Sequence, residues 1–202
     1  SGQFLFRYRN LLFPVAFGAL FLGSTPGTFP ASSVGKVWLT VFGIVCVTAG
    51  QCFRLLVIGY AYIKRGGKDG KVFADHLVIR GFYAHSRNPM YVGNVLIVAG
   101  LALVYGSAVA VFFIIPLFLY IYLAITVAEE RYLAGRFGAE YDAYVEKVNR
   151  FIPNLNGLGE SLKDFKYDWR RALRKDYGQI IQAAGVVLFF QYWKAHLSGV
   201  IT

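Results

Sequence analysis

The sequence predicts an all-α protein, a polytopic helical bundle that crosses a membrane about five times. Of its 202 residues, 56% are hydrophobic and only 16% are charged, against roughly 25% charged in ordinary soluble domains. A soluble protein of this size could not bury so many apolar side chains in its core, and a large apolar surface would stay exposed to water. The apolar residues form long runs, and the basic residues gather between them on one side. These observations favour lipid over water as the surrounding solvent.

Five apolar runs account for the expected membrane helices. They cover about 10–23, 37–60, 89–105, 108–128 and 178–195. The run from Ala108 to Ala128 contains no charged residue, and as a helix it would measure about 31 Å, enough to cross a hydrocarbon core. Pro116 is expected to kink this helix. Because Tyr105-Gly106-Ser107 leaves room only for a tight connection, the third and fourth runs are expected to form a helical hairpin.

The basic residues mark one side of the predicted bundle. Eighteen of the 21 lysines and arginines precede the first run or lie in the two long segments after the second and fourth runs. The opposite side, residues 24–36 and 106–107, carries only Lys36. The positive-inside rule then places the N-terminus and both long loops in the cytoplasm and the C-terminus outside. The net charge of +10 therefore indicates an anionic membrane surface, not nucleic acid, as the partner.

Residues 161–177 are expected to form an amphipathic interfacial helix. An apolar stripe recurs every four residues at Phe165, Trp169, Leu173 and Tyr177, and basic residues cover the remaining faces. Such a helix lies on anionic headgroups; packing against the protein's own cytoplasmic face is the alternative. We expect one integral membrane domain over 1–202, with the motifs at about 50–153 and the interfacial helix and last span at about 160–197.

The two cysteines give no sign of a disulfide or of a metal site. Cys46 and Cys52 lie in one apolar run and would face opposite ways on a helix, so we do not expect them to pair. The sequence also lacks the cysteine and histidine spacing typical of zinc sites. No metal is therefore expected.

Arg54 is a charged residue inside the second apolar run, with Gln51 one turn earlier. A guanidinium at membrane depth is costly unless it is paired or solvated. Snorkelling to the interface or a structural ion pair would satisfy it. The functional alternative is contact with an anionic substrate or a cofactor carboxylate in a cavity, and on that ground Arg54 is a candidate catalytic residue.

The stretch from Asp75 to Gly93 combines polar side chains with a helix that starts at a proline. Pro89 suits the first helical position because its missing N–H would be unpaired there anyway. The exposed N–H groups and the positive dipole end of such a helix attract a carboxylate or phosphate, and Gly81 and Gly93 permit close approach of the backbone. An ordinary interface turn anchored by tyrosine and arginine is the alternative.

Two adjacent carboxylates, Glu129 and Glu130, follow directly after the uncharged run. They suit a cationic partner, which is either the neighbouring Arg131 or the amino group or sulfonium of a bound cofactor. An aromatic stripe follows at Phe137, Tyr141 and Tyr144, a spacing typical of helix packing. The segment then ends with Arg150-Phe151-Ile152-Pro153.

In their order and spacing these stretches resemble the isoprenylcysteine carboxyl methyltransferase and phospholipid N-methyltransferase superfamily, over about residues 50–153. The matching residues are Gly81, Tyr83, Arg87, Asn88, Pro89, Tyr91, Gly93, Glu129, Glu130, Leu133, Phe137, Gly138, Tyr141, Tyr144, Arg150, Ile152 and Pro153. The resemblance implies methyl transfer from S-adenosylmethionine to a membrane-embedded or hydrophobic substrate. A prenylcysteine carboxylate and a phospholipid amine are both acceptors of this kind.

The resemblance also implies a cofactor site at the cytoplasmic ends of the third and fourth runs. The residues it assigns to the cofactor are Asp75, His76, Leu77, Val78, Tyr83, Arg87, Asn88, Pro89, Met90, Tyr91, Glu129 and Glu130. The candidate catalytic residues are Arg54, Glu130 and Arg150. The lipid substrate is expected to enter sideways between helices, and the short form of the chain favours a prokaryotic inner membrane.

One departure from the family bears on the acceptor. The eukaryotic isoprenylcysteine enzymes place an arginine about one turn before the glutamate pair, where this chain has Ile125 and Thr126. A prenylcysteine substrate would then need Arg54 or Arg150 in that role. The sequence leaves open whether oxygen, nitrogen or sulfur is methylated, and it leaves the oligomeric state open as well.

Two other classes of protein share part of this pattern. Sterol-reductase-like enzymes that use NADPH resemble the chain over Arg87–Gly93 and over the ending from Tyr141 to Pro153. They usually carry an acidic residue where this chain has Asn94, and they are larger. A non-enzymatic membrane scaffold would keep the fold without the activity. The Glu129-Glu130 pair favours the methyl donor over NADPH, and the intact motifs favour an enzyme over a scaffold.

Overall fold

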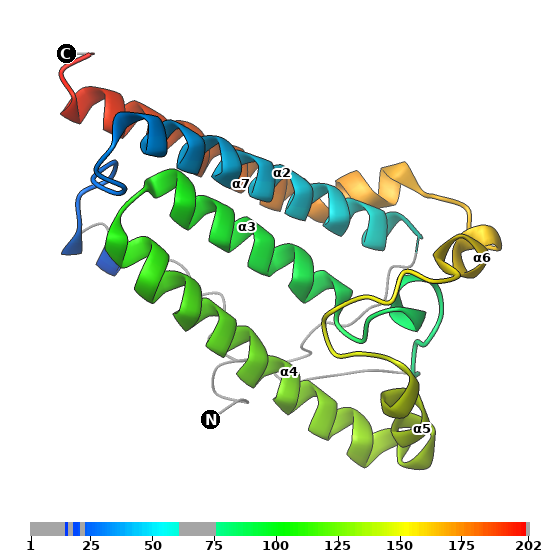
Figure 1. Ribbon diagram of the computed structural model, residues 1–202. Coiled ribbons are helices and arrows are strands. Elements are labelled where there is room, and N and C mark those ends of the chain that lie inside the picture. The colour runs from blue at the N-terminus through cyan, green and yellow to red at the C-terminus, as the bar shows by residue number, and fades with distance from the viewer. Residues whose placement is uncertain (1–14, 16–17, 21–22, 61–75, 201–202) are drawn as a thin grey trace.

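The computed structural model describes residues 15, 18–20, 23–60 and 76–200, and within these ranges the chain is helical with no strand. The longer helices are α2 (Ser33–Tyr60), α3 (Pro89–Tyr105), α4 (Ile115–Phe137) and α7 (Trp169–Leu197). The shorter elements are η1 (Gly81–Ala84), η2 (Ala110–Ile114), α5 (Ala139–Lys147) and α6 (Leu158–Lys163). Figure 1 shows α2, α3 and α7 side by side, α4 along α3, and α5, α6 and η1 gathered at one end of the bundle. The predicted all-α class is confirmed for the described residues.

Two helices are long and apolar enough to cross a membrane. They are Ser33–Tyr60 and Ala110–Phe137, each of 28 residues, and Pro89–Tyr105 is a shorter apolar helix. These three helices correspond to the second, fourth and third predicted runs. The first run falls mostly outside the described residues, and the fifth run forms the second half of α7. The count of five spans therefore stays a prediction.

Glycines allow α2 and α3 to pack backbone against backbone. A Cβ atom on Gly43 would lie 2.8 Å from the carbonyl oxygen of Gly100, and one on Gly50 would lie 2.7 Å from the carbonyl oxygen of Gly93. The two contacts are seven residues apart on both helices, so the antiparallel pair stays in close contact over about two turns. Small residues serve this purpose in membrane bundles, where packing must replace the hydrophobic effect.

The predicted hairpin between α3 and α4 is present. Gly106 ends α3 with a φ of 70°, and the N–H of Ala110 donates to Ser107 Oγ at 3.1 Å. The kink expected at Pro116 stays a prediction, and a π turn, η2, ends two residues before that proline. There the N–H of Ile115 donates to the carbonyl of Ala110, five residues earlier. The wider turn accommodates Pro116, which has no N–H to donate to a carbonyl one turn earlier.

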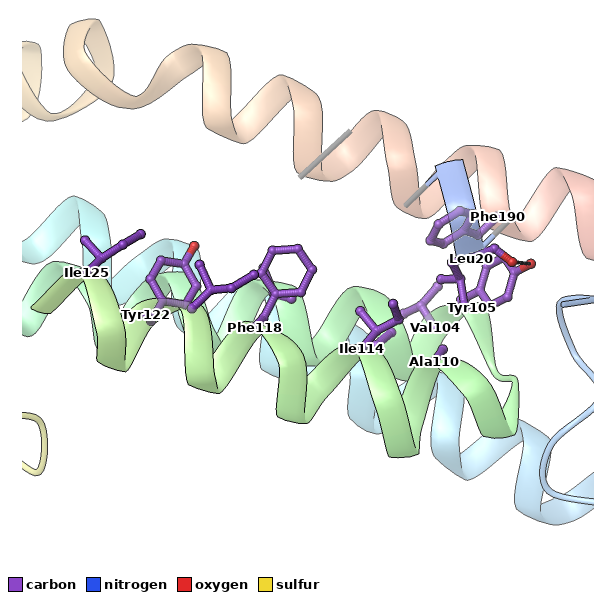
Figure 2. Close-up of a cluster of buried hydrophobic side chains, with 12 residues drawn as sticks. Leu20, Val104, Tyr105, Ala110, Ile114, Phe118, Tyr122, Ile125 and Phe190 are labelled. Atoms are coloured by element: carbon purple, nitrogen blue, oxygen red, sulfur yellow. Dashed lines mark hydrogen bonds between the residues drawn. The ribbon is translucent and has the colours of Figure 1, made fainter. Parts of the chain in front are cut away.

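The largest group of buried apolar side chains lies along α4 where it faces α3. Figure 2 shows one row of them running from η2 along α4 at spacings of three and four residues: Ile114, Phe118, Tyr122 and Ile125. At the far end of this group, Tyr105 of α3 and Phe190 of α7 meet edge to face, with ring centroids 5.0 Å apart. These contacts hold α4 and α7 to the α2–α3 pair.

The single interfacial helix predicted over 161–177 is wrong. Helix α6 ends at Lys163 and α7 begins at Trp169, and α7 then runs without a break through the predicted fifth span. Asp168 separates the two helices as an N-cap, because its carboxylate accepts the N–H of Arg171 at 2.9 Å. This hydrogen bond lowers the pKa of Asp168. The apolar repeat from Phe165 to Trp169 therefore crosses a helix boundary.

Candidate functional site

The motif before α3 and the motif after α5 meet in space. Hydrogen bonds join segment 85–88 to segment 149–154. They run from Arg87 N to Asn149 O (2.9 Å), from Asn154 N to His85 O (3.0 Å), from Ser86 Oγ to Phe151 O (3.0 Å) and from Asn88 Nδ2 to Arg150 O (3.2 Å). The second segment therefore lies over the start of α3.

Helix α3 begins as the proline motif predicts. Asn88 occupies the N-cap position, and its side chain makes no capping hydrogen bond to the helix. Its amide nitrogen donates to the carbonyl of Arg150. Pro89 follows in the first helical turn. The first turn thus keeps the anion-attracting character of a helix N-terminus.

Two arginines hold Glu130. Arg150 makes a forked contact with Oε2 of Glu130, through Nε at 3.0 Å and Nη2 at 2.8 Å. Arg87 Nη2 lies 3.5 Å from Oε1 of the same carboxylate, whose side chain is only 12% exposed. The hydrogen bond with Glu130 raises the pKa of Arg150. This cluster of Arg87, Glu130 and Arg150, which we call the Glu130 clamp, joins α4 to the segment before α3 and to the segment after α5.

Glu129 points toward α3 instead. Its Oε1 accepts a hydrogen bond from Tyr91 Oη at 2.7 Å, and the Tyr91 ring packs against Tyr122 with centroids 5.4 Å apart. One turn earlier on α4, Thr126 Oγ1 is buried and has no hydrogen-bond partner among the described residues. The side of α4 that faces α3 therefore brings together a carboxylate, a phenol and a hydroxyl.

The remaining predicted cofactor residues divide between packing and exposed positions. Tyr83, Val78 and Met90 lie in one apolar cluster with Val57 and Phe82, and the carbonyl of Tyr83 accepts the Tyr144 hydroxyl at 2.6 Å. Leu77 packs against a second cluster, whose buried members are Leu133, Tyr141, Tyr144 and Val148. His76 is exposed, and Asp75 lies outside the described residues. Leu77, Val78 and Tyr83 thus take part in apolar packing among the described residues.

Arg54 of α2 contacts α3 at Asn94, one turn after Tyr91, and belongs to a different network. Its guanidinium binds the carboxylate of Asp176 on α7, with Nε 3.1 Å from Oδ2, and it also donates to Asn94 Oδ1. Gln51 donates to the same carboxylate, and Asp176 is only 2% exposed. The sequence left open snorkelling, a structural ion pair or contact with a substrate or cofactor for Arg54. The structure shows the ion pair.

Sequence reasoning missed two residues of these networks. Asp176 was not singled out, although it shares a stripe with Ala172 and Ala183, which are also buried. A lone acid on the small-residue stripe of a basic helix was the available signal. His85 was passed over as well; its Nε2 lies 2.9 Å from Ser161 Oγ of α6, a contact that nothing in the local sequence indicates.

Comparisons with known proteins match the part of the chain that carries these motifs. The phospholipid methyltransferase family matches residues 38–140. A "Protein-S-isoprenylcysteine O-methyltransferase" from Schizosaccharomyces pombe (strain 972 / ATCC 24843) is 37% identical over 109 residues, which are 53% of this chain and 41% of the relative. The chain thus spans about two fifths of the length of that relative. No solved structure matches the chain.

Proposed function

The chain belongs to the phospholipid methyltransferase family, and from that premise we propose that it transfers a methyl group from S-adenosylmethionine to an acceptor on a lipid or lipid-like substrate. The observation that carries the proposal is the meeting of Glu129 and Tyr91 beside the start of α3. Glu130, which the Glu130 clamp holds, is the next residue along α4. The two helices able to cross a membrane agree with a substrate that resides in the bilayer.

The groups around Glu129 fit the amino-acid end of S-adenosylmethionine. That end carries an ammonium, a carboxylate and a sulfonium within a few bonds of one another. The Glu129 carboxylate suits either cation, and the start of α3 suits the carboxylate. The buried hydroxyl of Thr126, which has no partner among the described residues, would gain one from such a ligand. Asn88 to Tyr91 would then line the site together with Glu129.

The bound cofactor would supply an electrophilic methyl group on its sulfonium. Residues 88–91 and Glu129 would hold the cofactor so that its methyl group could pass to an acceptor in line with the carbon–sulfur bond, whose electron pair would stay with sulfur. The protein contributes alignment and the exclusion of water. Glu129, kept in place by Tyr91, would orient the cationic end. A carboxylate or thiolate acceptor needs no base, whereas an amine must arrive neutral.

We assign Glu130 and Arg150 to positioning instead of contact with the reacting atoms. Their forked ion pair keeps segment 149–154 over the start of α3. Arg54 is a candidate of the same kind, because its described contacts are to Asp176 and Asn94. Its effect on turnover would then pass through the placement of α3 and α7.

We further propose that the end of the bundle with α5, α6 and η1 faces the cytoplasm. Most basic residues lie at this end of the predicted topology, and the positive-inside rule then orients the chain. The site would open at the inner leaflet, where a lipid-borne acceptor could reach it without leaving the membrane.

Methyl transfer into a lipid extract tests the proposal directly. Purified protein in lipid nanodiscs would receive S-adenosylmethionine labelled in its methyl group together with a membrane lipid extract, and mass spectrometry would follow the label. We expect a labelled lipid-soluble product whose formation needs Glu129. S-adenosylhomocysteine should raise the melting temperature and NADPH should not. Absence of both label and stabilisation would refute the assignment.

A further inference from the structure

Helix α7 begins with a strongly basic segment that lies outside the family match. Within Trp169–Tyr177, the residues Arg170, Arg171, Arg174 and Lys175 are all exposed. The two nearest acids do not cover this charge. Asp168 pairs with Arg171 at 3.2 Å, and Asp176 is buried against Arg54. Neither Arg170 nor Arg174 has an acidic partner among the described residues.

An exposed apolar stripe lies beside these cations. Trp169, Leu173 and Tyr177 are 58%, 46% and 62% exposed, while Ala172 and Asp176 form the buried face of the same turns. Among the described residues, these exposures favour contact with the surroundings over packing on the protein's own surface. Aromatic side chains and cations that share one exposed face are typical of a membrane interface.

Contacts along α7 place it at the same depth as the membrane-length helix α2. The N–H of Asp168 donates to the carbonyl of Gly59 at 3.0 Å, and Lys194 Nζ lies 3.2 Å from Thr40 Oγ1. Helix α7 therefore follows α2 from near one end to near the other, as Figure 1 shows. Its basic segment lies at the end of the bundle that holds α5 and α6.

The ion pair between Arg54 and Asp176 fixes the depth of the basic segment relative to the membrane. Arg54 binds Asn94, and Tyr91, one turn earlier on α3, contacts Glu129 at the end of the uncharged run. Asp176 thus lies about one turn inside that end. Residues 169–175 precede Asp176 by about 1.5 to 10 Å along the helix. That interval reaches into the headgroup layer, which is about 5–8 Å thick on each side of the bilayer.

We propose that residues 169–177 form a binding surface for anionic lipid headgroups. Arg170 and Arg174 contact the phosphates, and the flanking stripe of Trp169, Leu173 and Tyr177 enters the boundary of the acyl chains. Helix α7 passes through the interface, with Trp169 and Arg170 at headgroup depth and Arg174 reaching that depth with its side chain, in place of a separate helix lying flat on the membrane. The surface is independent of methyl transfer.

Lipid retention by two matched variants tests the surface. Arg170→Gln/Arg174→Gln removes two cations from it, and Arg136→Gln/Lys147→Gln removes two exposed cations from α4 and α5 at the same end of the bundle. Each full-length protein would be incubated in micelles with equal phosphatidylcholine and phosphatidylglycerol and repurified, and its retained lipids quantified by mass spectrometry. The melting temperature in phosphatidylcholine alone checks that the variants fold.

Wild-type protein should retain more phosphatidylglycerol than phosphatidylcholine, and high salt should reduce the excess because it screens the charges. One cation at an anionic surface is worth about fivefold in binding, so the ratio should fall by at least this factor in Arg170→Gln/Arg174→Gln and stay unchanged in the control. A wild-type ratio of one, an equal fall in both variants, or full enrichment in Arg170→Gln/Arg174→Gln would overturn the proposal. The salt dependence of the wild-type protein tests it without any variant.

Discussion

Adjacent residues on a helix point about 100° apart, and Glu129 and Glu130 show what this does to two identical side chains. Glu129 points to α3 and accepts the hydroxyl of Tyr91. Glu130 points to the segment after α5 and is held by Arg150 and Arg87. The two glutamates, which are adjacent in the sequence, thus have different partners. Substitution of each glutamate is therefore expected to have a different effect.

Glu129→Gln should weaken the binding of S-adenosylhomocysteine by about 10- to 100-fold, the usual worth of a hydrogen bond to a charged group. The amide oxygen can still accept the Tyr91 hydroxyl, so the melting temperature of the free protein should change little. Titration calorimetry measures the affinity, and Glu146→Gln, at an exposed position on α5, is the matched control. Unchanged affinity would show that the cofactor does not use Glu129.

Glu130→Gln should lower stability more than affinity. The substitution leaves two arginines without their carboxylate, and a cost of about 1–2 kcal/mol is expected. The cost is smaller than for a fully buried pair because Arg150 is 39% exposed. Unfolding midpoints in detergent would measure it, with Arg150→Lys as a second variant that keeps the charge but loses the fork. A larger loss of cofactor affinity than in Glu129→Gln would reverse the two roles.

At the scale of the elements, the position of α3 depends on its contact with α2. The glycine pairs bring the two backbones together, and this places Arg54 directly against Gly93, where a Cβ atom would lie 2.5 Å from Arg54 Cγ. Gly93 therefore serves the structure through its missing side chain. The start of α3, which carries Tyr91, is in turn held where it can reach α4.

Gly50→Ala should destabilise the protein by about 1–3 kcal/mol, the usual cost of overpacking. Its Cβ would lie 2.7 Å from the carbonyl oxygen of Gly93, a backbone atom that cannot rotate away. Gly185→Ala on α7 is the control, since its Cβ would meet nothing within 4 Å, and helix propensity should leave it neutral or more stable. Equal unfolding midpoints for both variants would disprove the tight contact.

At the scale of the whole molecule, the Arg54–Asp176 pair joins the family-matched region to a helix beyond it. Asp176→Asn would leave a buried guanidinium without its counter-ion, and a loss of about 3–5 kcal/mol is expected. Arg54→Met/Asp176→Leu removes both charges and should recover part of that loss. A double-mutant cycle on unfolding in detergent measures the coupling. Additive single effects would mean that the pair does not hold α7 in place.

Much of the fold was predictable because its signals are local. The apolar runs at 37–60, 89–105 and 108–128, the turn at Gly106 and the helix start at Pro89 each depend on neighbours within one or two turns. The family was predictable for a related reason, since its motifs keep their order along the chain. The boundary at Asp168 was missed because a continuing apolar repeat hid a capping residue.

The sequence by itself determined that this chain is helical, that it carries membrane-length apolar helices and that it belongs to a methyltransferase family. Composition and ordered motifs are properties of the chain alone. Only the tertiary structure decided which carboxylate faces α3, which partner Arg54 takes and which face of α7 stays exposed. Those outcomes depend on contacts such as Arg54–Asp176 between residues 122 positions apart, and the packing of several helices at once selects them.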